Sequence, residues 1–209
     1  AALAAMDNPS LLAVKTVVLN PRNPDKGLPQ INGLVTMLDS DSGLPVAILD
    51  GNWITAVRTA GLSAVAAKYM ANKDAAVCGF VGCGVQARSH LQAFSDMFSL
   101  RHVKLFGRGQ ANIDGMCRFA DELGLSSEIC ASGRDAAESA DLVVTSVTFS
   151  AQLDPPLDAS RLAPGCFAAV TDLGAPWQQE SFSAFDRVAI DDLEQEAALP
   201  NKLAAPEHV

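Results

Sequence analysis

The chain has 209 residues, of which 49% are hydrophobic and 19% charged, a composition typical of folded domains and not of disordered or collagen-like chains. Fifteen basic residues stand against 24 acidic ones, and the formal net charge of −9 disfavours binding to nucleic acid or to an anionic membrane surface. A chain of this length forms one or two domains.

The five cysteines are scattered and include no CxxC pair, and the three histidines form no metal-ligand pair with them. This pattern is typical of reduced thiols, and it predicts neither a disulfide framework nor a metal site. The N-terminal segment lacks the basic start and apolar stretch of a signal peptide, and no run is long enough to span a membrane. We therefore expect a cytoplasmic protein.

The first third of the sequence predicts a small sheet followed by a long helix. The apolar, β-branched run at 14–19 ends in a turn cluster with two prolines. Two further apolar runs, 33–38 and 44–49, flank a five-residue connection that ends in Gly43, which is typical of an antiparallel hairpin. The Ala-rich segment 53–71 has apolar residues at helical spacing and predicts one helix leading out of the sheet.

Beyond residue 73, short apolar runs alternate with helical stretches. Parallel strands need crossover helices and are buried on both faces, so this alternation predicts a parallel sheet and an α/β fold class. The expected domains are a partial smaller domain at 1–72 and a parallel-sheet domain at 73–209. Strands are expected at 75–81, 103–106, 140–147, 165–171 and 187–191, and helices at 85–98 and 111–123.

The strand expected at 75–81 runs into the pattern G-x-G-x-x-A and then into a helix. Gly82 permits a tight turn, Gly84 lets the backbone approach a diphosphate, and Ala87 lets the helix pack closely on the strand. The helix N-terminus presents free N–H groups and the positive end of its dipole to phosphates. The pattern predicts dinucleotide binding, and the alternative is a strand–helix turn with only a structural role.

The end of the next strand bears on which dinucleotide binds. NAD-binding proteins usually place an acid about 20 residues after the glycine pattern, but this sequence has Arg108 there, within G-R-G-Q. A guanidinium suits the 2′-phosphate of NADP through paired N–H donors. NADPH is therefore the expected cofactor, NAD is the alternative cofactor, and a solvated surface arginine is the alternative interpretation of Arg108.

Four motifs follow one another along the chain: N-P-x-N-x-x-x-G-L-P at 20–29, L-D-G-x-x-I-T-x-x-R-T-A at 49–60, S-A-V-A-A-K-Y at 63–69 and G-x-G-x-Q-A at 82–87. Together they resemble the ornithine cyclodeaminase and mu-crystallin family. The resemblance implies a Rossmann-type domain preceded by part of an α/β dimerisation domain, a homodimer, and hydride transfer at the α-carbon of an amino or imino acid. Family chains are longer at both ends, so the sequence resembles their central portion.

By this resemblance Lys15 and Arg58 hold the substrate carboxylate, which would compensate the cost of burying cations beside nicotinamide. The alternatives are an exposed strand lysine and a helix-surface arginine. Asp172 is the candidate catalytic acid, but the aspartate of cyclodeaminases falls on Gly174 of this sequence. Proton transfer tolerates little displacement, so this departure disfavours cyclodeamination.

The resemblance carries over further cofactor positions, which continue the glycine loop, follow Arg108 or end the strand at 140–147: Val85, Gln86, Gly109, Asn112, Val147 and Thr148. The expected function is an NADPH-dependent oxidoreductase that reduces the imine of a small cyclic or linear imino acid, or the reverse oxidation. The alternatives are a cyclodeaminase-type lyase that releases ammonia with recycled NAD, and a non-catalytic NADPH-dependent ligand-binding protein.

Overall fold

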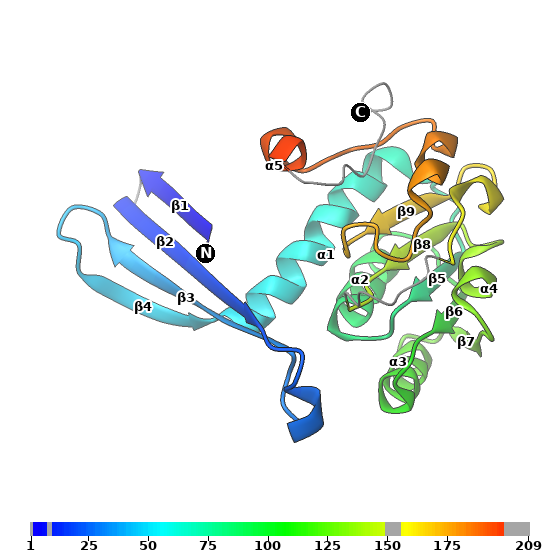
Figure 1. Ribbon diagram of the computed structural model, residues 1–209, viewed down its shortest axis with the longest axis horizontal. Helices are drawn as coiled ribbons and strands as arrows, with labels where there is room; N and C mark the ends of the chain where they lie inside the picture. Colours follow the sequence, from blue (N-terminus) through cyan, green and yellow to red (C-terminus); the bar gives the residue numbers. More distant parts are fainter. Residues whose placement is uncertain (1, 8–9, 149–155, 199–209) are drawn as a thin grey trace. The chain divides into compact units, whose positions relative to one another are not determined.

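The chain divides by its contacts into two compact units, Ala1–Arg58 and Thr59–Val209. The division falls within a long helix, α1, Gly51–Met70. The sequence pattern placed the domain boundary after this helix, near residue 72, and that boundary stays a prediction. The computed structural model (Figure 1) describes residues 2–7, 10–148 and 156–198.

The first unit contains a four-stranded antiparallel sheet in the order β1-β2-β3-β4, drawn in blue in Figure 1. The hairpin predicted around residues 39–43 is confirmed, because β3 and β4 pair antiparallel across it. β1 was not predicted, since ALAAMD contains no β-branched residue, and it forms by pairing along its whole length with β2. The strands are β1 Ala2–Asp7, β2 Ser10–Leu19, β3 Ile31–Asp39 and β4 Pro45–Asp50, with a 3-10 turn at Pro24–Lys26 between β2 and β3.

The predicted long helix α1 begins directly after β4, within the L-D-G motif. A Cβ atom at Gly51 would lie 2.7 Å from the carbonyl oxygen of Gly33 on β3, so only glycine fits at this junction. Asp50 Oδ1 accepts a hydrogen bond from the N–H of Asn52 at 2.8 Å, and Asn52 Oδ1 accepts one from the N–H of Gly33 at 2.8 Å. The motif therefore joins the strand, the helix and the neighbouring strand.

The second unit is built on a five-stranded parallel sheet in the order β7-β6-β5-β8-β9, which confirms the predicted α/β architecture (Figure 1). β5 lies at the centre, and the chain adds β6 and β7 on one side before it returns to add β8 and β9 on the other. The strands are β5 Val77–Val81, β6 His102–Phe106, β7 Ser126–Ile129, β8 Leu142–Thr145 and β9 Phe167–Val170.

Two apolar clusters cover the two faces of this sheet. Because successive side chains of a strand point to opposite faces, Cys78 and Phe80 of β5 pack with α2 and α3, whereas Val81 packs with α4 and the 3-10 turns η2 and η3. Gly79 faces α4, and a Cβ atom there would collide with the carbonyl oxygen of Ala136. The helices are α2 Val85–Ser95, α3 Gln110–Glu122, α4 Gly133–Ala137, η2 Ala159–Arg161, η3 Gln179–Ala184 and α5 Leu193–Ala198.

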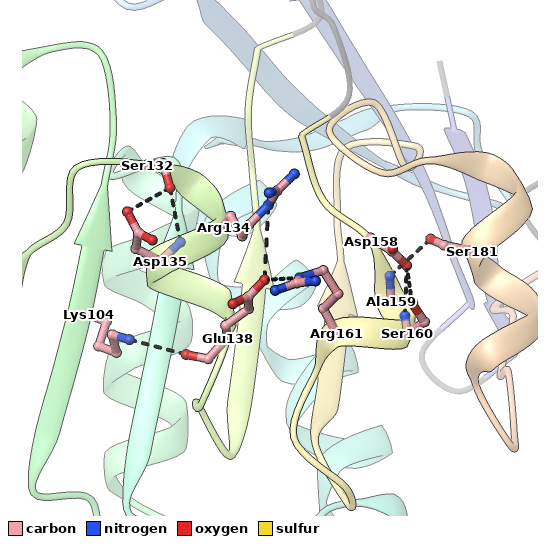
Figure 2. A network of polar contacts seen from close by, with 10 residues as sticks. All are labelled: Lys104, Ser132, Arg134, Asp135, Glu138, Asp158, Ala159, Ser160, Arg161 and Ser181. Carbon is pink, nitrogen blue, oxygen red and sulfur yellow. Dashed lines mark hydrogen bonds and ion pairs between the residues drawn. The ribbon is translucent and has the colours of Figure 1, made fainter.

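A polar network on the second face connects α4 with η2 and β6 (Figure 2). The carboxylate of Glu138, which ends α4, accepts a hydrogen bond from Arg161 Nε at 2.5 Å and lies 4.0 Å from Arg134 Nε. Lys104 Nζ donates to the carbonyl oxygen of Glu138 at 3.1 Å. The two arginines are about half exposed, so the network orients these segments and adds little stability.

One strand prediction was wrong. Residues 187–191 (RVAID) form no strand in the structure, and three of these five residues are exposed. Their apolar alternation spans too few residues to decide between a strand and a loop without a pairing partner. Within the described ranges, no helix combines the length and the apolarity that crossing a membrane requires.

Candidate functional site

The candidate coenzyme residues gather at one edge of the parallel sheet. All five strands run in the same direction, so the loops that follow β5, β6, β8 and β9 lie at the carboxyl edge. The strand order reverses between β5 and β8, and open α/β sheets bind ligands beside such a switch point. The structure thus brings to one edge the four loops that contain the predicted coenzyme residues and Asp172.

The glycine loop after β5 has the geometry predicted from its pattern. Gly82 has a φ of +101°, and a Cβ atom there would lie 2.6 Å from the carbonyl oxygen of Ser146. Where the Cβ of Gly84 would stand, no described atom lies within 4 Å, so the backbone faces open space there. Ala87 is fully buried against the sheet, which lets α2 approach closely.

The N-terminus of α2 lies directly after this loop. Gly84 is its N-cap residue, and no side chain in the described part of the chain caps the helix. The N–H groups of the first turn and the helix dipole therefore favour an anion at this point. Val85, the first helical residue, is 68% exposed, and Gln86 is half-buried. These residues are the part of the site that could hold a diphosphate.

His90 lies one helical turn after Gln86, and sequence reasoning assigned it no role. Its Nδ1 lies 2.7 Å from the carbonyl oxygen of Gln86 and its Nε2 lies 2.9 Å from Ser63 Oγ on α1. Because a carbonyl only accepts, Nδ1 carries the proton, and the Ser63 hydroxyl donates to Nε2. Burial lowers the pKa of His90, and the contact with Gln86 offsets part of this effect. A neutral His90 therefore joins α1 to the first turn of α2.

The loop after β6 packs against the glycine loop. A Cβ atom at Gly107 would lie 3.3 Å from Cys83 Sγ, and that thiol lies 3.5 Å from the carbonyl oxygen of Phe106. Burial raises the pKa of Cys83 to about 11, so the thiol stays protonated and fills space.

Arg108 is exposed and stands directly before α3. Gly109 is the N-cap residue of α3, and its carbonyl oxygen accepts a hydrogen bond from the N–H of Asn112 at 3.0 Å. Asn112 is also exposed, and Asn112 Nδ2 lies 3.5 Å from where a Gly109 Cβ would stand. This segment offers one guanidinium, one amide and a helix N-terminus without a side-chain cap to a phosphate.

Asp172 is turned toward the end of β8. Its Oδ1 accepts a hydrogen bond from Thr145 Oγ1 at 3.0 Å, and its Oδ2 accepts one from the N–H of Val147 at 2.9 Å. Burial raises the pKa of Asp172 more than its hydrogen bonds, those from Val147 and Thr145 first among them, lower it. Thr148, the next residue along, is exposed. Both carboxylate oxygens of Asp172 are thus occupied by the chain itself.

The two candidate substrate residues of the first unit lie near each other. Lys15 is half-buried on β2, opposite Val35 of β3, and Arg58 is exposed on α1. Burial and the charge of Arg58 both lower the pKa of Lys15. A carboxylate bound beside the two cations would relieve their repulsion. Within the described residues, no group of three or more His, Cys, Asp or Glu side chains could hold a metal ion.

A model of the ornithine cyclodeaminase/mu-crystallin family matches residues 2–183. Alanine dehydrogenase from Archaeoglobus fulgidus is 30% identical over 185 residues, which cover 87% of this chain and 56% of that protein. Ketimine reductase mu-crystallin from Rattus norvegicus is 29% identical over 189 residues, which cover 90% of this chain and 58% of that protein. The chain therefore spans about half the length of the curated relatives it matches.

Among solved structures, Delta(1)-pyrroline-2-carboxylate reductase from Thermococcus litoralis, in complex with NADH and L-proline, matches with a TM-score of 0.79. It is 27% identical in sequence, and the match covers 87% of this chain and 57% of that one. The similarity extends over both sheets of the present chain, since 87% of 209 residues cannot lie within either unit alone.

Proposed function

This chain belongs to the ornithine cyclodeaminase/mu-crystallin family, and on that premise we propose that the protein is an NADPH-dependent oxidoreductase. The enzyme reduces the imine of a small cyclic or linear imino acid, or catalyses the reverse oxidation. The carboxyl edge of the parallel sheet carries this proposal, because the glycine loop and the α2 N-terminus lie there at the switch point. The names of three relatives, a ketimine reductase, a pyrroline-carboxylate reductase and an alanine dehydrogenase, agree with it.

We assign the coenzyme contacts by position along this edge. The glycine loop fits a diphosphate, because Gly82 takes a conformation that side chains rarely adopt and the backbone at Gly84 is open. The segment at Arg108, with Gly109 and Asn112, suits the 2′-phosphate that distinguishes NADPH from NADH. The coenzyme supplies the hydride. This chain's residues bind and orient it, and the nicotinamide end lies near Val147 and Thr148, at the end of β8.

The substrate is a small molecule that carries a carboxylate. Lys15 and Arg58 supply two positive charges. Burial and the charge of Arg58 lower the pKa of Lys15, and a bound anion would offset both effects. Two cations can bind both oxygens of one carboxylate and fix the orientation of the imine carbon.

We also propose that the protein forms a homodimer through the first unit. Large apolar side chains of β2 and β4 are exposed, and monomers rarely leave so many in one small sheet. A second copy packed on one face of this sheet would cover side chains such as Val18 and Ile48, which the strand register places on the same face. The five cysteines are free thiols, which agrees with a cytoplasmic location.

Cyclodeamination receives less support. The lyase needs an acid aimed at substrate, whereas both oxygens of Asp172 accept hydrogen bonds from Thr145 and Val147. The remaining alternative is a protein that binds NADPH and a ligand without turning them over.

The test is a titration of the purified chain with NADPH and NADH, followed by an assay with pyrroline-2-carboxylate or piperideine-2-carboxylate. Binding of NADPH with loss of its nicotinamide absorbance supports the reductase. Binding without turnover supports the ligand-binding alternative, and ammonia release from ornithine supports the lyase. The proposed function is refuted if the wild type binds neither NADPH nor NADH. In calorimetry this outcome appears as equal heats for the wild type and for Gly82→Val, the variant expected to lose coenzyme binding.

A further inference from the structure

Two aspartate carboxylates accept hydrogen bonds near the two ends of β8. At the amino edge, Asp141 Oδ2 accepts hydrogen bonds from the N–H groups of Ala76 and Val77, at 2.8 and 2.9 Å. At the carboxyl edge, Asp172 accepts one from the N–H of Val147 and one from the hydroxyl of Thr145. Asp141 and Asp172 thus make comparable hydrogen bonds, but of the two only Asp172 lies at the candidate coenzyme site.

The hydrogen bonds that end on Asp172 have a fixed direction. Trp177 Nε1 lies 3.2 Å from Thr145 Oγ1, and an indole nitrogen can only donate. Thr145 Oγ1 therefore accepts from Trp177 and points its own hydrogen at Asp172 Oδ1. Since Oδ2 also receives a donor, from Val147, the carboxylate acts here as an acceptor at both oxygens. Trp177 and Thr145 are buried, so water does not compete with this chain of contacts.

The backbone after Asp172 takes an unusual course. Leu173 has a φ of +55° and Gly174 a φ of +70°, and the turn closes with a hydrogen bond from the N–H of Ala175 to the carbonyl oxygen of Asp172 at 3.2 Å. A leucine in the left-handed region is unfavourable and persists only where the surroundings fix it. The side chain of Leu173 is 64% exposed and gains little from packing, so its backbone is held by the contacts around it.

The segment held by Asp172 also touches the glycine loop. Ser146 donates its N–H to the carbonyl oxygen of Val81 at 2.9 Å, and the carbonyl oxygen of Ser146 packs against Gly82. A shift of the chain after β8 would therefore displace the loop after β5. We propose that Asp172 is a positioning residue, which fixes the peptide of Val147 and thereby the nicotinamide end of the coenzyme site, and that it is not the proton donor. This inference rests on the proposed function.

The test compares two ligands, NADPH and 2′-phospho-ADP-ribose, which lacks only the nicotinamide. Calorimetry gives the ratio of their dissociation constants for each variant. Asp172→Ala should weaken NADPH by about tenfold and leave 2′-phospho-ADP-ribose within about twofold, because the change acts at the nicotinamide end. Asp141→Asn is the matched control: it should lower the melting temperature and leave the ratio unchanged.

Thr145→Val removes the hydroxyl that donates to Asp172 and should change the ratio in the same direction, whereas Thr145→Ser, which keeps the hydroxyl, should restore it. These two variants decide the question if Asp172→Ala does not fold. An equal loss for both ligands, or no loss for either, would overturn the positioning role. If the wild type binds neither ligand, the proposed function itself fails. If the wild type binds both equally, the coenzyme function stands and the inference about its nicotinamide end is refuted.

Discussion

The two sheets of this chain differ in how completely their own unit covers them. In β2, β3 and β4 of the first sheet, Val35 is the one buried residue, and Ile48 is 73% exposed. In the second sheet, every residue of β8 is buried, and apolar clusters line both faces. A covered sheet can hold its loops in place without help, whereas the first sheet depends on further surfaces. We therefore expect the second unit to bind the coenzyme by itself. Binding of the substrate carboxylate by Lys15, in contrast, should depend on formation of the proposed dimer.

The largest expected effect is at the glycine loop of the covered sheet. Gly82→Val should weaken coenzyme binding by about a hundredfold or more, because a side chain there combines an unfavourable φ with a collision against Ser146. Gly124→Val is the control, since Gly124 also has a positive φ, of +74°, but open space around its Cβ. Calorimetry with NADPH should show a loss in the first variant and normal affinity in the second. Equal affinities would show that this loop does not hold the coenzyme.

The next effect concerns the uncovered sheet. Ile48→Asp should convert the proposed dimer into a monomer, raising the dissociation constant by roughly fiftyfold or more, because it would place a charge in the proposed apolar interface. Ile129→Asp makes the same substitution at an isoleucine that is 55% exposed, on the edge strand of the other sheet, and should leave the assembly intact. Light scattering after size-exclusion chromatography measures both. A dimer that survives Ile48→Asp would place the interface elsewhere.

A smaller effect is expected at Arg108, which we propose as the residue that sets the choice of coenzyme within the covered unit. Arg108→Asp should weaken NADPH by about tenfold relative to NADH, because the new carboxylate repels the 2′-phosphate and can accept from a 2′-hydroxyl. Arg101→Asp makes the same charge change at the opposite edge of the sheet, before β6. It should leave the ratio of the two affinities unchanged. An unaltered ratio in the Arg108 variant would remove its role as phosphate ligand.

The smallest effect concerns the stability of the covered unit at low pH. The pKa of His90 is lowered in the folded chain, so between its unfolded value near 6.5 and its folded value the unfolded chain binds more protons. The stabilising contribution of neutral His90 is fully present above that unfolded value and is lost as pH falls, by at most about 1.4 kcal/mol per pH unit. Denaturant titrations at pH 7.5 and 5.5 should show a smaller loss in His90→Gln than in the wild type. Identical losses would mean that His90 does not titrate in this range.

Local patterns were enough to predict most elements and the glycine loop. The G-x-G-x-x-A spacing defines a turn through residues close together in the sequence. Likewise, β3 and β4 are joined by a short connection whose turn-forming residues are visible in the sequence. β7, by contrast, reads SSEI, with two serines and one glutamate among four residues, and is a strand because it pairs with β6. Its sequence alone gives no signal for that pairing.

The site was predicted unevenly for the same reason. Gly82 and Gly84 follow from a local motif, whereas the partners of Asp172 lie 25 and 27 positions away in the chain. His90 likewise meets Ser63 across 27 positions. A sequence lists such residues without their distances, so the motif was found and the hydrogen bonds around it were missed. The spacing of Gln86 and His90, four residues apart on one helix, was the available local signal.

The close approach of α4 to Gly79 restricts how this protein can diverge. Even the smallest side chain at position 79 would strike the carbonyl oxygen of Ala136, so accommodating one would require α4 to retreat from the sheet. A codon-randomised library selected for folded protein should therefore return glycine alone at this position, while neighbouring surface codons vary freely. Other positions of β5 can change wherever the packing leaves room for a Cβ atom. At position 79 there is no such room, so glycine has no substitute there.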